Sequence, residues 1–371
     1  MKSRHVAQAA AVTAFLTIAA LLVGAEVRLG QPDGLTVHEW GTFTSVAGED
    51  GNSINWNVLG GNDDLPRFVN DNYHCIKGLL AGSVRMETPV LYFYSARPME
   101  ARVHVSFPQG TITEWYPQAD QSSGIEWKNL KIEPGTSPVY PVEKSPSHYY
   151  AARATDAAPV TAGSQHEKFL FYRGIGSFPI PLSARVAADG SVAVANRTAG
   201  PVPTVILFEN RGGRIGFRTT AVTDTITLDR PSLDAAFPQL RSHLESALVA
   251  EGLFPKEAAA MMETWRDSWF EEGARLIYIV PSRTVDEVLP LEISPAPAQI
   301  SRVFVGRIEL ITPATLSAVQ QAVAVNDHAV AAQYGRFVEP ILSRLILANR
   351  VDRQLAQRFR AGVPYQGRSC Q

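Results

Sequence analysis

The feature that most constrains the fold is a succession of short apolar or alternating runs, separated by turn residues, between Leu35 and about Leu228. A period of two residues is typical of β-strands, because successive side chains of a strand point to opposite faces. Many short strands at fairly regular spacing predict an antiparallel fold of the sandwich type. The clearest runs are residues 36–46, 90–95, 101–107, 111–116, 168–173, 184–187, 191–195, 204–208, 214–221 and 224–228.

Two turn sequences predict hairpins between these strands. Asp189 and Gly190 separate two of the runs, and this pair is typical of type I′ turns, in which both central residues take a positive φ. Residues 210–213, Asn-Arg-Gly-Gly, mark a second hairpin, since such glycine-containing clusters are turn signals.

After Asp229 the pattern changes to helical periods. Glycines just past the first two helices, and a threonine-proline pair before a later one, are stop and start signals. The predicted elements are helices over residues 232–250 and 255–272, strands over 275–280 and 302–310, and helices from Thr312 and over 337–360. The predicted fold class is therefore α+β: a β-sandwich-like antiparallel domain over 31–228, followed by a helix-rich α/β domain over 229–371.

The first 25 residues have the layout of an export signal. Lys2 and Arg4 precede an uncharged apolar stretch at 6–24, and small residues occupy 23–25. This order of basic, apolar and small residues is typical of a signal peptide. The stretch is also near the roughly 20 residues that span a bilayer as a helix, so an uncleaved N-terminal anchor is the alternative. Both interpretations place the later residues in an extracytoplasmic space, periplasmic or secreted.

Charge and cysteine content bound the partners and the cross-links. The formal net charge is −2, whereas nucleic-acid binders normally present a basic face. No nucleic-acid partner is expected, and membrane contact is expected only through an uncleaved N-terminal segment. The two cysteines, Cys75 and Cys370, are candidates for a disulfide in an exported protein, with two separate thiols as the alternative.

One carboxylate lies on an otherwise apolar strand face. In residues 35–45, LTVHEWGTFTS, the odd-numbered side chains share one face, and Glu39 is their acidic member. A buried carboxylate must be paired or protonated. Burial also raises the pKa of a carboxyl group, which suits a general acid. A structural salt bridge to an arginine is the alternative.

Two further carboxylates are candidate partners for Glu39. Glycoside hydrolysis needs two carboxyl groups about 5–10 Å apart. Glu87 lies shortly before the aromatic run 91–94, and Glu272 lies on the apolar arc at the end of the second predicted helix. A frayed helix end is the alternative for Glu272.

Several aromatic side chains are candidates for binding a glycan, because sugar-binding surfaces use exposed rings with a polar edge. Aromatic residues in strands also fill protein cores, which is the alternative. The candidate binding residues are His38, Trp40, Trp115, Tyr149 and Tyr150.

Short metal and nucleophile motifs are absent from the sequence. His38 and Glu39 begin the pattern H-E-x-x-H, but position 42 is threonine, so the second zinc ligand is missing. The serine-hydrolase pattern G-x-S-x-G is also missing. No cofactor and no metal is predicted, although a metal site assembled from distant segments stays open.

Residues 38–45 (HEWGTFTS) and 85–94 (RMETPVLYFY) resemble stretches of exported bacterial proteins that have no assigned function. Residues 265–273 (WRDSWFEEG) and 275–281 (RLIYIVP) fit the same pattern. The resemblance covers most of the chain after residue 25. It implies an exported bacterial protein and brings no reaction, ligand or catalytic residue with it.

Three hypotheses of function remain. The first is an extracytoplasmic binding or cell-envelope-associated protein that recognises a glycan or a protein partner. The second is a hydrolase of a polysaccharide or cell-wall polymer, with Glu39 as acid and Glu87 or Glu272 as its partner. The third is a metal-dependent or other enzyme. In each case the cleft between the two predicted domains is the expected site, because pockets favour domain interfaces.

Overall fold

The computed structural model describes residues 34–59, 65–72 and 81–363 of the chain. The predicted signal or anchor over residues 1–25 and both cysteines, Cys75 and Cys370, lie outside the described residues.

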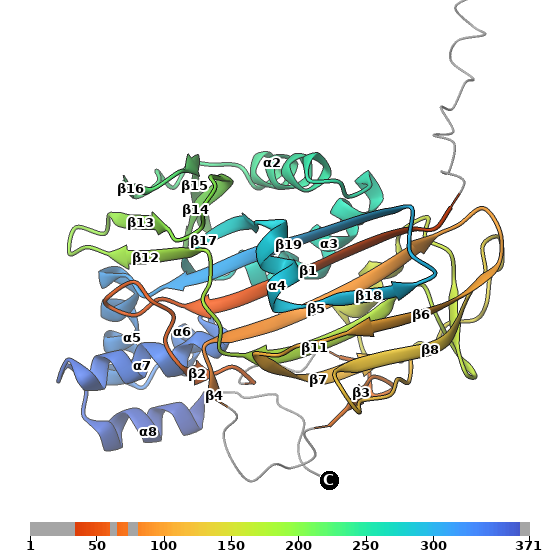
Figure 1. Ribbon diagram of the computed structural model, residues 1–371. Coiled ribbons are helices and arrows are strands. Elements are labelled where there is room, and N and C mark those ends of the chain that lie inside the picture. Colours follow the sequence, from red (N-terminus) through yellow and green to blue (C-terminus); the bar gives the residue numbers. More distant parts are fainter. Residues whose placement is uncertain (1–33, 60–64, 73–80, 364–371) are drawn as a thin grey trace, which may run out of the picture.

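A nine-stranded sheet forms the centre of the molecule (Figure 1). Its strand order is β15 (Arg214–Val222), β14 (Val202–Arg211), β17 (Gly273–Val280), β19 (Gln299–Leu310), β1 (Thr36–Val46), β5 (Val84–Tyr94), β11 (Leu170–Gly176), β7 (Gly110–Tyr116) and β3 (Asn70–Asp71). β1 and β19 are parallel, and all other neighbours in this sheet are antiparallel.

Two smaller antiparallel sheets, of five and three strands, cover one face of the central sheet. The five-stranded sheet has the order β10 (Gln165–Glu167), β9 (Val160–Ala162), β8 (Ile125–Ile132), β6 (Met99–Val105) and β18 (Leu291–Ser294). The three-stranded sheet has the order β12 (Leu182–Val186), β13 (Val192–Asn196) and β16 (Thr225–Leu228). A separate pair is formed by β2 (Trp56–Asn57) and β4 (Ala81–Gly82). One apolar core joins Val37 and Phe43 of β1 to Trp127 of β8 and Val194 of β13. The β-rich part is therefore sandwich-like, as predicted.

Helices α2 (Phe237–Ala250) and α3 (Pro255–Trp269) cover the opposite face of the central sheet, together with the 3₁₀-helix η1 (His148–Arg153). A second core there joins Trp40 of β1 and Ile277 of β17 to Met261 of α3. The two faces of β1 thus enter two different cores, as its alternating sequence predicts.

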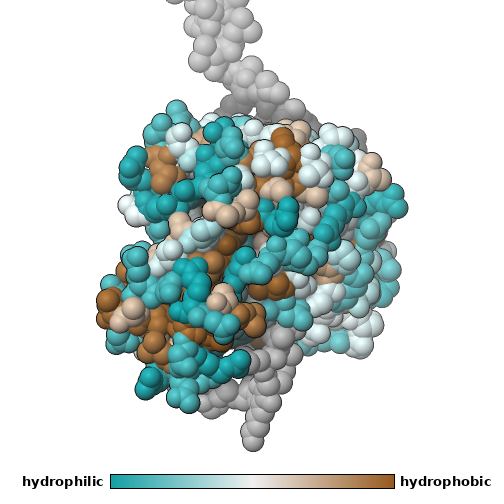
Figure 2. Space-filling view, turned by 90° about the vertical axis from the view of Figure 1, so that its left-hand side faces the viewer, coloured by the Kyte–Doolittle hydropathy of each residue, from teal (hydrophilic) through white to brown (hydrophobic). Residues whose placement is uncertain are grey.

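A group of helices packs at one end of the central sheet, at the left in Figure 1. These helices are α5 (Pro313–Val325), α6 (His328–Ala332), η2 (Gly335–Phe337), α7 (Val338–Leu347) and α8 (Arg353–Gly362), while α4 (Ser282–Val288) connects β17 to β18. A third core joins Val46 at the end of β1 to Leu342 and Phe359. Figure 2 views this end, where hydrophobic side chains gather in the lower half of the surface.

The predicted α+β class is confirmed, with large antiparallel sheets and the helices in the C-terminal part. β17 and β19 nevertheless lie between β14 and β1. Residues on both sides of position 228 therefore form one sheet, and the predicted boundary at 228 does not divide it. Within the described residues, no helix is long and apolar enough to cross a membrane.

Both predicted hairpins form, but the turn type predicted for the first one is found at the second. Gly190 alone takes a positive φ, 87°, between β12 and β13. The type I′ turn predicted there is therefore wrong, because that turn needs two such residues. Gly212 and Gly213, with φ values of 60° and 78°, connect β14 to β15 and supply both positive angles.

Candidate functional site

Glu39 is fully buried and held by an ion pair. Its Oε2 accepts a hydrogen bond from Nε of Arg302 at 2.6 Å, and the hydroxyl of Tyr172 donates to Oε1. Arg302, on β19, also contacts Asp286 of α4 at 2.8 Å. The arrangement matches the salt-bridge alternative, because both carboxylate oxygens already have donors.

Glu87 is also buried, and arginine surrounds its carboxylate. Arg336 binds both oxygens, with Nη2 at 2.9 Å from Oε2. Thr44 donates to Oε2 at 2.6 Å, and Nε of Arg85 lies 3.3 Å from Oε1. Burial by itself would raise the pKa of Glu87, but Arg336, Arg85 and Thr44 outweigh it and bring the pKa to about 2. Glu87 is therefore an ionised acceptor at neutral pH and has no proton to donate.

Glu272 lies beyond the end of α3, which stops at Trp269. Its carboxylate accepts a hydrogen bond from the backbone N–H of Gly212 at 2.9 Å. Its carbonyl oxygen accepts one from Arg275 at 2.8 Å. The helix prediction was three residues too long, so the frayed-end alternative describes this residue. Glu39, Glu87 and Glu272 thus bind separate partners and do not form a facing carboxylate pair.

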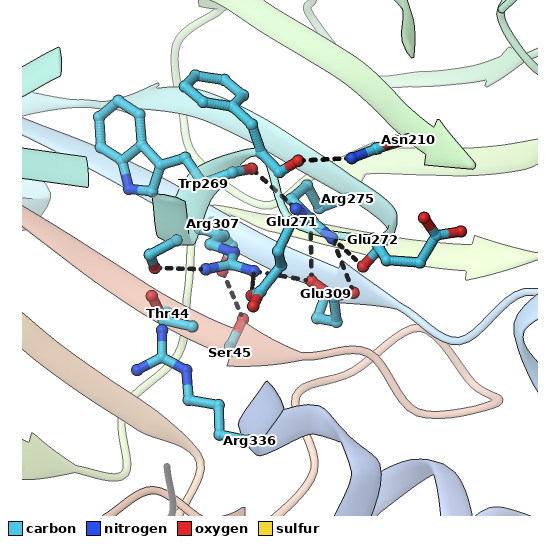
Figure 3. A network of polar contacts seen from close by, with 12 residues as sticks. Thr44, Ser45, Asn210, Trp269, Glu271, Glu272, Arg275, Arg307, Glu309 and Arg336 are labelled. Atoms are coloured by element: carbon cyan, nitrogen blue, oxygen red, sulfur yellow. Dashed lines mark hydrogen bonds and ion pairs between the residues drawn. The ribbon is translucent and has the colours of Figure 1, made fainter. Parts of the chain in front are cut away.

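Sequence reasoning missed a buried arginine–glutamate cluster next to Glu272 (Figure 3). Nε of Arg275 lies 3.1 Å from Glu309 Oε2. Nη2 of Arg307 lies 3.2 Å from the same oxygen and 2.6 Å from Glu271 Oε1. Burial raises the pKa of Glu309 despite both arginines. The carboxylate of Glu272 points away from these groups in Figure 3.

This cluster joins elements and leaves little capacity for a ligand. Arg275 also donates to the carbonyl oxygen of Trp269 at 2.8 Å, which fixes the end of α3 to β17. The guanidinium of Arg307 lies 4.7 Å from the ring centre of Phe337 in η2. Most of the cationic and carboxylate atoms therefore already have partners where α3, β17, β19 and the helical end meet, although Nε of Arg307 has none within the described residues.

The predicted aromatic binding residues lie mainly in the core. Trp40, Trp115 and Tyr149 are buried, and Tyr150 is partly buried. The hydroxyl of Tyr149 donates to Glu167 at 3.1 Å. These rings pack inside the protein, in agreement with the alternative that aromatic residues of strands fill the core. They do not form an exposed platform for a sugar.

His38, the remaining candidate for binding, connects β1 to α3. Its Nδ1 lies 2.8 Å from Glu257 Oε2. Tyr94 donates to the other oxygen of Glu257 at 2.7 Å, and the N–H of Phe254 donates to Oε2 at 2.7 Å. Nε2 is buried and has no hydrogen-bond partner within the described residues.

Two hollows open on the surface of the described residues. The first, about 330 Å³, has polar side chains from Asn72, Ser106, Thr111, Gln121 and Ser123. The second, about 310 Å³, is lined by the polar residues Asn52, Ser53, Ser83, Ser177, Ser183 and Arg197. All of these residues precede position 228, so neither hollow lies at the predicted domain interface. Among the described residues, no group of three or more His, Cys, Asp or Glu side chains is placed to hold a metal ion.

No protein-family model matches the chain, and no curated protein sequence matches it. Two solved structures show a weak likeness: the yeast delta-COP-I mu-homology domain alone, and the same domain complexed with a Dsl1 WxWxV peptide. The TM-scores are 0.29 and 0.30 at 8% identity, over 75% of this chain and 96% and 97% of those chains. These values are too low to indicate a shared fold or function.

Proposed function

We propose that the protein is an extracytoplasmic binding protein of the bacterial cell envelope that recognises a glycan. The observation that carries the proposal is the chemistry of the two surface hollows, in which hydroxyl and amide side chains supply nearly all polar groups. Export itself is part of the proposal, since it rests on the basic and apolar N-terminal sequence.

Sugars match such linings because each hydroxyl group both donates and accepts hydrogen bonds. Serine and threonine hydroxyls have the same dual capacity, and asparagine and glutamine amides supply donors and acceptors side by side. Both hollows are at the lower end of the volumes usual for small-ligand sites, about 300–1,000 Å³. A volume of that size suits one or two sugar rings of a longer polymer.

The carboxylates support binding over hydrolysis. A glycosidase needs one protonated carboxyl group and one free carboxylate facing the same bond. Glu39 and Glu87 are 0% and 2% exposed and are each occupied by an arginine. Glu87, with a pKa of about 2, stays ionised. Their positions favour a structural role for both.

The test is to incubate residues 26–371 with soluble polysaccharides and with insoluble peptidoglycan. Binding is measured by affinity electrophoresis and co-sedimentation, and release of reducing ends is measured in the same samples. We expect binding without product.

Product release that disappears in a folded Glu39→Gln variant would overturn the proposal in favour of a hydrolase. Neither binding nor product would remove the glycan as ligand and would point to a protein partner.

A further inference from the structure

The second hollow is assembled from segments that are distant in the sequence. Asn52 and Ser53 follow β1, Ser83 lies between β4 and β5, and Ser177 directly follows β11. Ser183, in β12, and Arg197, which follows β13, complete its polar lining. We call this site the serine hollow.

The serine hollow has polar and apolar parts, and one of its hydroxyl groups is closed to solvent. The Oγ atom of Ser53 is buried and has no hydrogen-bond partner within the described residues. Because this atom is closed to solvent, a ligand does not reach it, and the hydroxyl groups open to a ligand are those of the other serines. Phe178 and Leu182 supply apolar surface in the same hollow, against which the carbon face of a sugar ring can pack.

Arg197 brings a positive charge to the hollow and is held in place. Its backbone N–H donates to the carbonyl oxygen of Pro181 at 2.8 Å, and its Nη2 donates to Oδ1 of Asn52. Asn52 is fixed in turn by Asp50, whose carboxylate accepts from the backbone N–H of Asn52 at 2.9 Å and from its Nδ2 at 2.5 Å.

The side chain of Arg197 is therefore oriented before a ligand arrives. Arg197 is an exposed residue, and Nη2 is the only guanidinium nitrogen that contacts another described residue. Nε and Nη1 remain for a ligand. A guanidinium group offers paired N–H donors that match the two oxygens of a carboxylate, which the point charge of lysine does not.

We infer that the serine hollow binds an acidic sugar residue, a hexuronate, with its carboxylate on Arg197 and its hydroxyl groups on the serines. This inference rests on the proposed glycan-binding function and adds the class of sugar. Asp50 is the nearby carboxylate and interacts electrostatically with Arg197, but its oxygens accept hydrogen bonds from Asn52, and it makes no hydrogen bond to the guanidinium within the described residues.

Polygalacturonate and its fully methyl-esterified form are the decisive pair of probes, because they share a backbone and differ in the carboxylate charge. We expect the protein, residues 26–371, to bind the acidic polymer at least about 10-fold more tightly, the size of one charged bidentate contact. Arg197→Gln should remove this preference, and Arg197→Lys, which keeps the charge but not the paired donors, should reduce it. Arg218→Gln, a change of an exposed arginine on β15, is the matched control and should retain it.

Ser177→Ala separates a ligand contact from a structural role. Ser177 is exposed, and its hydroxyl accepts one long hydrogen bond, from the N–H of Ser83 at 3.3 Å, so its removal should change the melting temperature little. Affinity for polygalacturonate should nevertheless fall several-fold, since one hydrogen bond to the ligand is lost. A lower melting temperature with unchanged affinity would overturn the assignment of Ser177 to the site.

The outcomes distinguish this inference from the function on which it rests. Equal affinity for the two polymers, insensitive to Arg197→Gln, would overturn the acidic-sugar assignment while glycan binding stands. Competition by inorganic phosphate but not by galacturonate would also overturn it, because the site would then select phosphate. Absence of binding to every polysaccharide tested would remove both proposals.

Discussion

At the scale of single residues, Glu39 shows that a sequence pattern can predict burial of a side chain but not its partner. Alternation along β1 predicts that its side chain is buried, and the residue is 0% exposed. Alternation cannot predict whether a proton or a cation neutralises the carboxylate. That depends on Arg302, which is 263 positions away in the sequence and is brought beside Glu39 by the pairing of β1 with β19.

Glu39→Gln should destabilise the protein by about 3 kcal/mol. The substitution leaves the guanidinium of Arg302 buried without its main counter-charge, and breaking one side of a buried pair typically costs about 3–5 kcal/mol. The remaining contact with Asp286 reduces the loss. Urea denaturation at pH 7 measures it.

Glu287→Gln is the control for this change, because Glu287 forms an exposed pair with Arg283. Its effect should stay within about 0.5 kcal/mol. Equal stability of Glu39→Gln and the unmodified protein would contradict a structural role for the Glu39–Arg302 pair.

Glu87 makes stability depend on pH in the acid range. Its folded-state pKa of about 2 lies below its ordinary value of 4.5. A depressed carboxyl pKa stabilises the folded state above the unfolded pKa, and this contribution is lost as the pH falls from 4.5 toward 2. At about 1.4 kcal/mol per unit, the full contribution is roughly 3 kcal/mol.

The free energy of unfolding in urea at pH 7, 5, 3.5 and 2.5 tests this dependence. Glu87→Gln removes the titrating group, so the difference from the unmodified protein should shrink as the pH falls. Glu263→Gln, on the exposed side of α3, should follow the unmodified protein throughout. A constant difference for Glu87→Gln across the range would show that its carboxylate does not titrate as argued.

At the scale of helices and strands, local sequence signals predicted the type of each element better than the residues at which it begins and ends. Residues 337–360 were predicted as one helix, but α7 ends at Leu347 and α8 begins at Arg353. Asn349 takes a positive φ of 54°, and Asp352 caps α8 by accepting from two backbone N–H groups. Asparagine with positive φ often ends a helix, and aspartate often caps the start of one. The helical spacing of apolar residues continues past both positions, so the sequence pattern did not predict that two helices meet here.

Strand pairing adds packing constraints that no local signal carries. Gly306 of β19 lies opposite Tyr278 of β17, whose ring is buried. A Cβ atom at position 306 would lie 2.1 Å from Cζ of Tyr278. The glycine is therefore required by the aromatic ring across the strand, which occupies the space of a side chain.

Gly306→Ala should lower the free energy of unfolding by about 2 kcal/mol, because an added methyl group in a packed core forces neighbours apart. Gly200→Ala is the control, since a Cβ atom there meets nothing within 4 Å. Thermal and urea unfolding measure both changes.

A second substitution, Tyr278→Leu, tests the cause of the loss. If the ring causes the clash, the double variant should be more stable than the sum of the two single effects allows. Strict additivity would contradict the proposed clash.

At the scale of the molecule, the sequence predicted the α+β class but not the order of strands in space. β1 is the first strand of the chain and lies between β5 and β19. Its parallel pairing with β19 joins segments more than 250 positions apart, which periodicity cannot reveal. The serine hollow could not be predicted for the same reason. No sequence pattern distinguishes its serines, which lie in separate loops and strands and become neighbours only in the folded protein.

The shared sheet leads to a prediction about the chain divided at residue 228. A fragment covering residues 26–228 lacks β17 and β19, which lie between β14 and β1 in the intact sheet. Both flanking strands would then expose unpaired backbone groups, and two cores would lose apolar residues such as Leu276 and Val305. Buried backbone groups and apolar side chains both need these partners.

We therefore expect the 26–228 fragment to lack a cooperative unfolding transition in urea, and its amide NMR signals to be poorly dispersed. The intact chain over residues 26–371 should unfold in one cooperative step, because the central sheet links the β-rich and helix-rich segments. Adding the separate 229–371 segment should restore dispersion if the strands find their places between β14 and β1. A well-dispersed spectrum and a cooperative transition for the 26–228 fragment alone would instead show two independently folding domains, and β17 and β19 would then be an addition to a sheet that is stable without them.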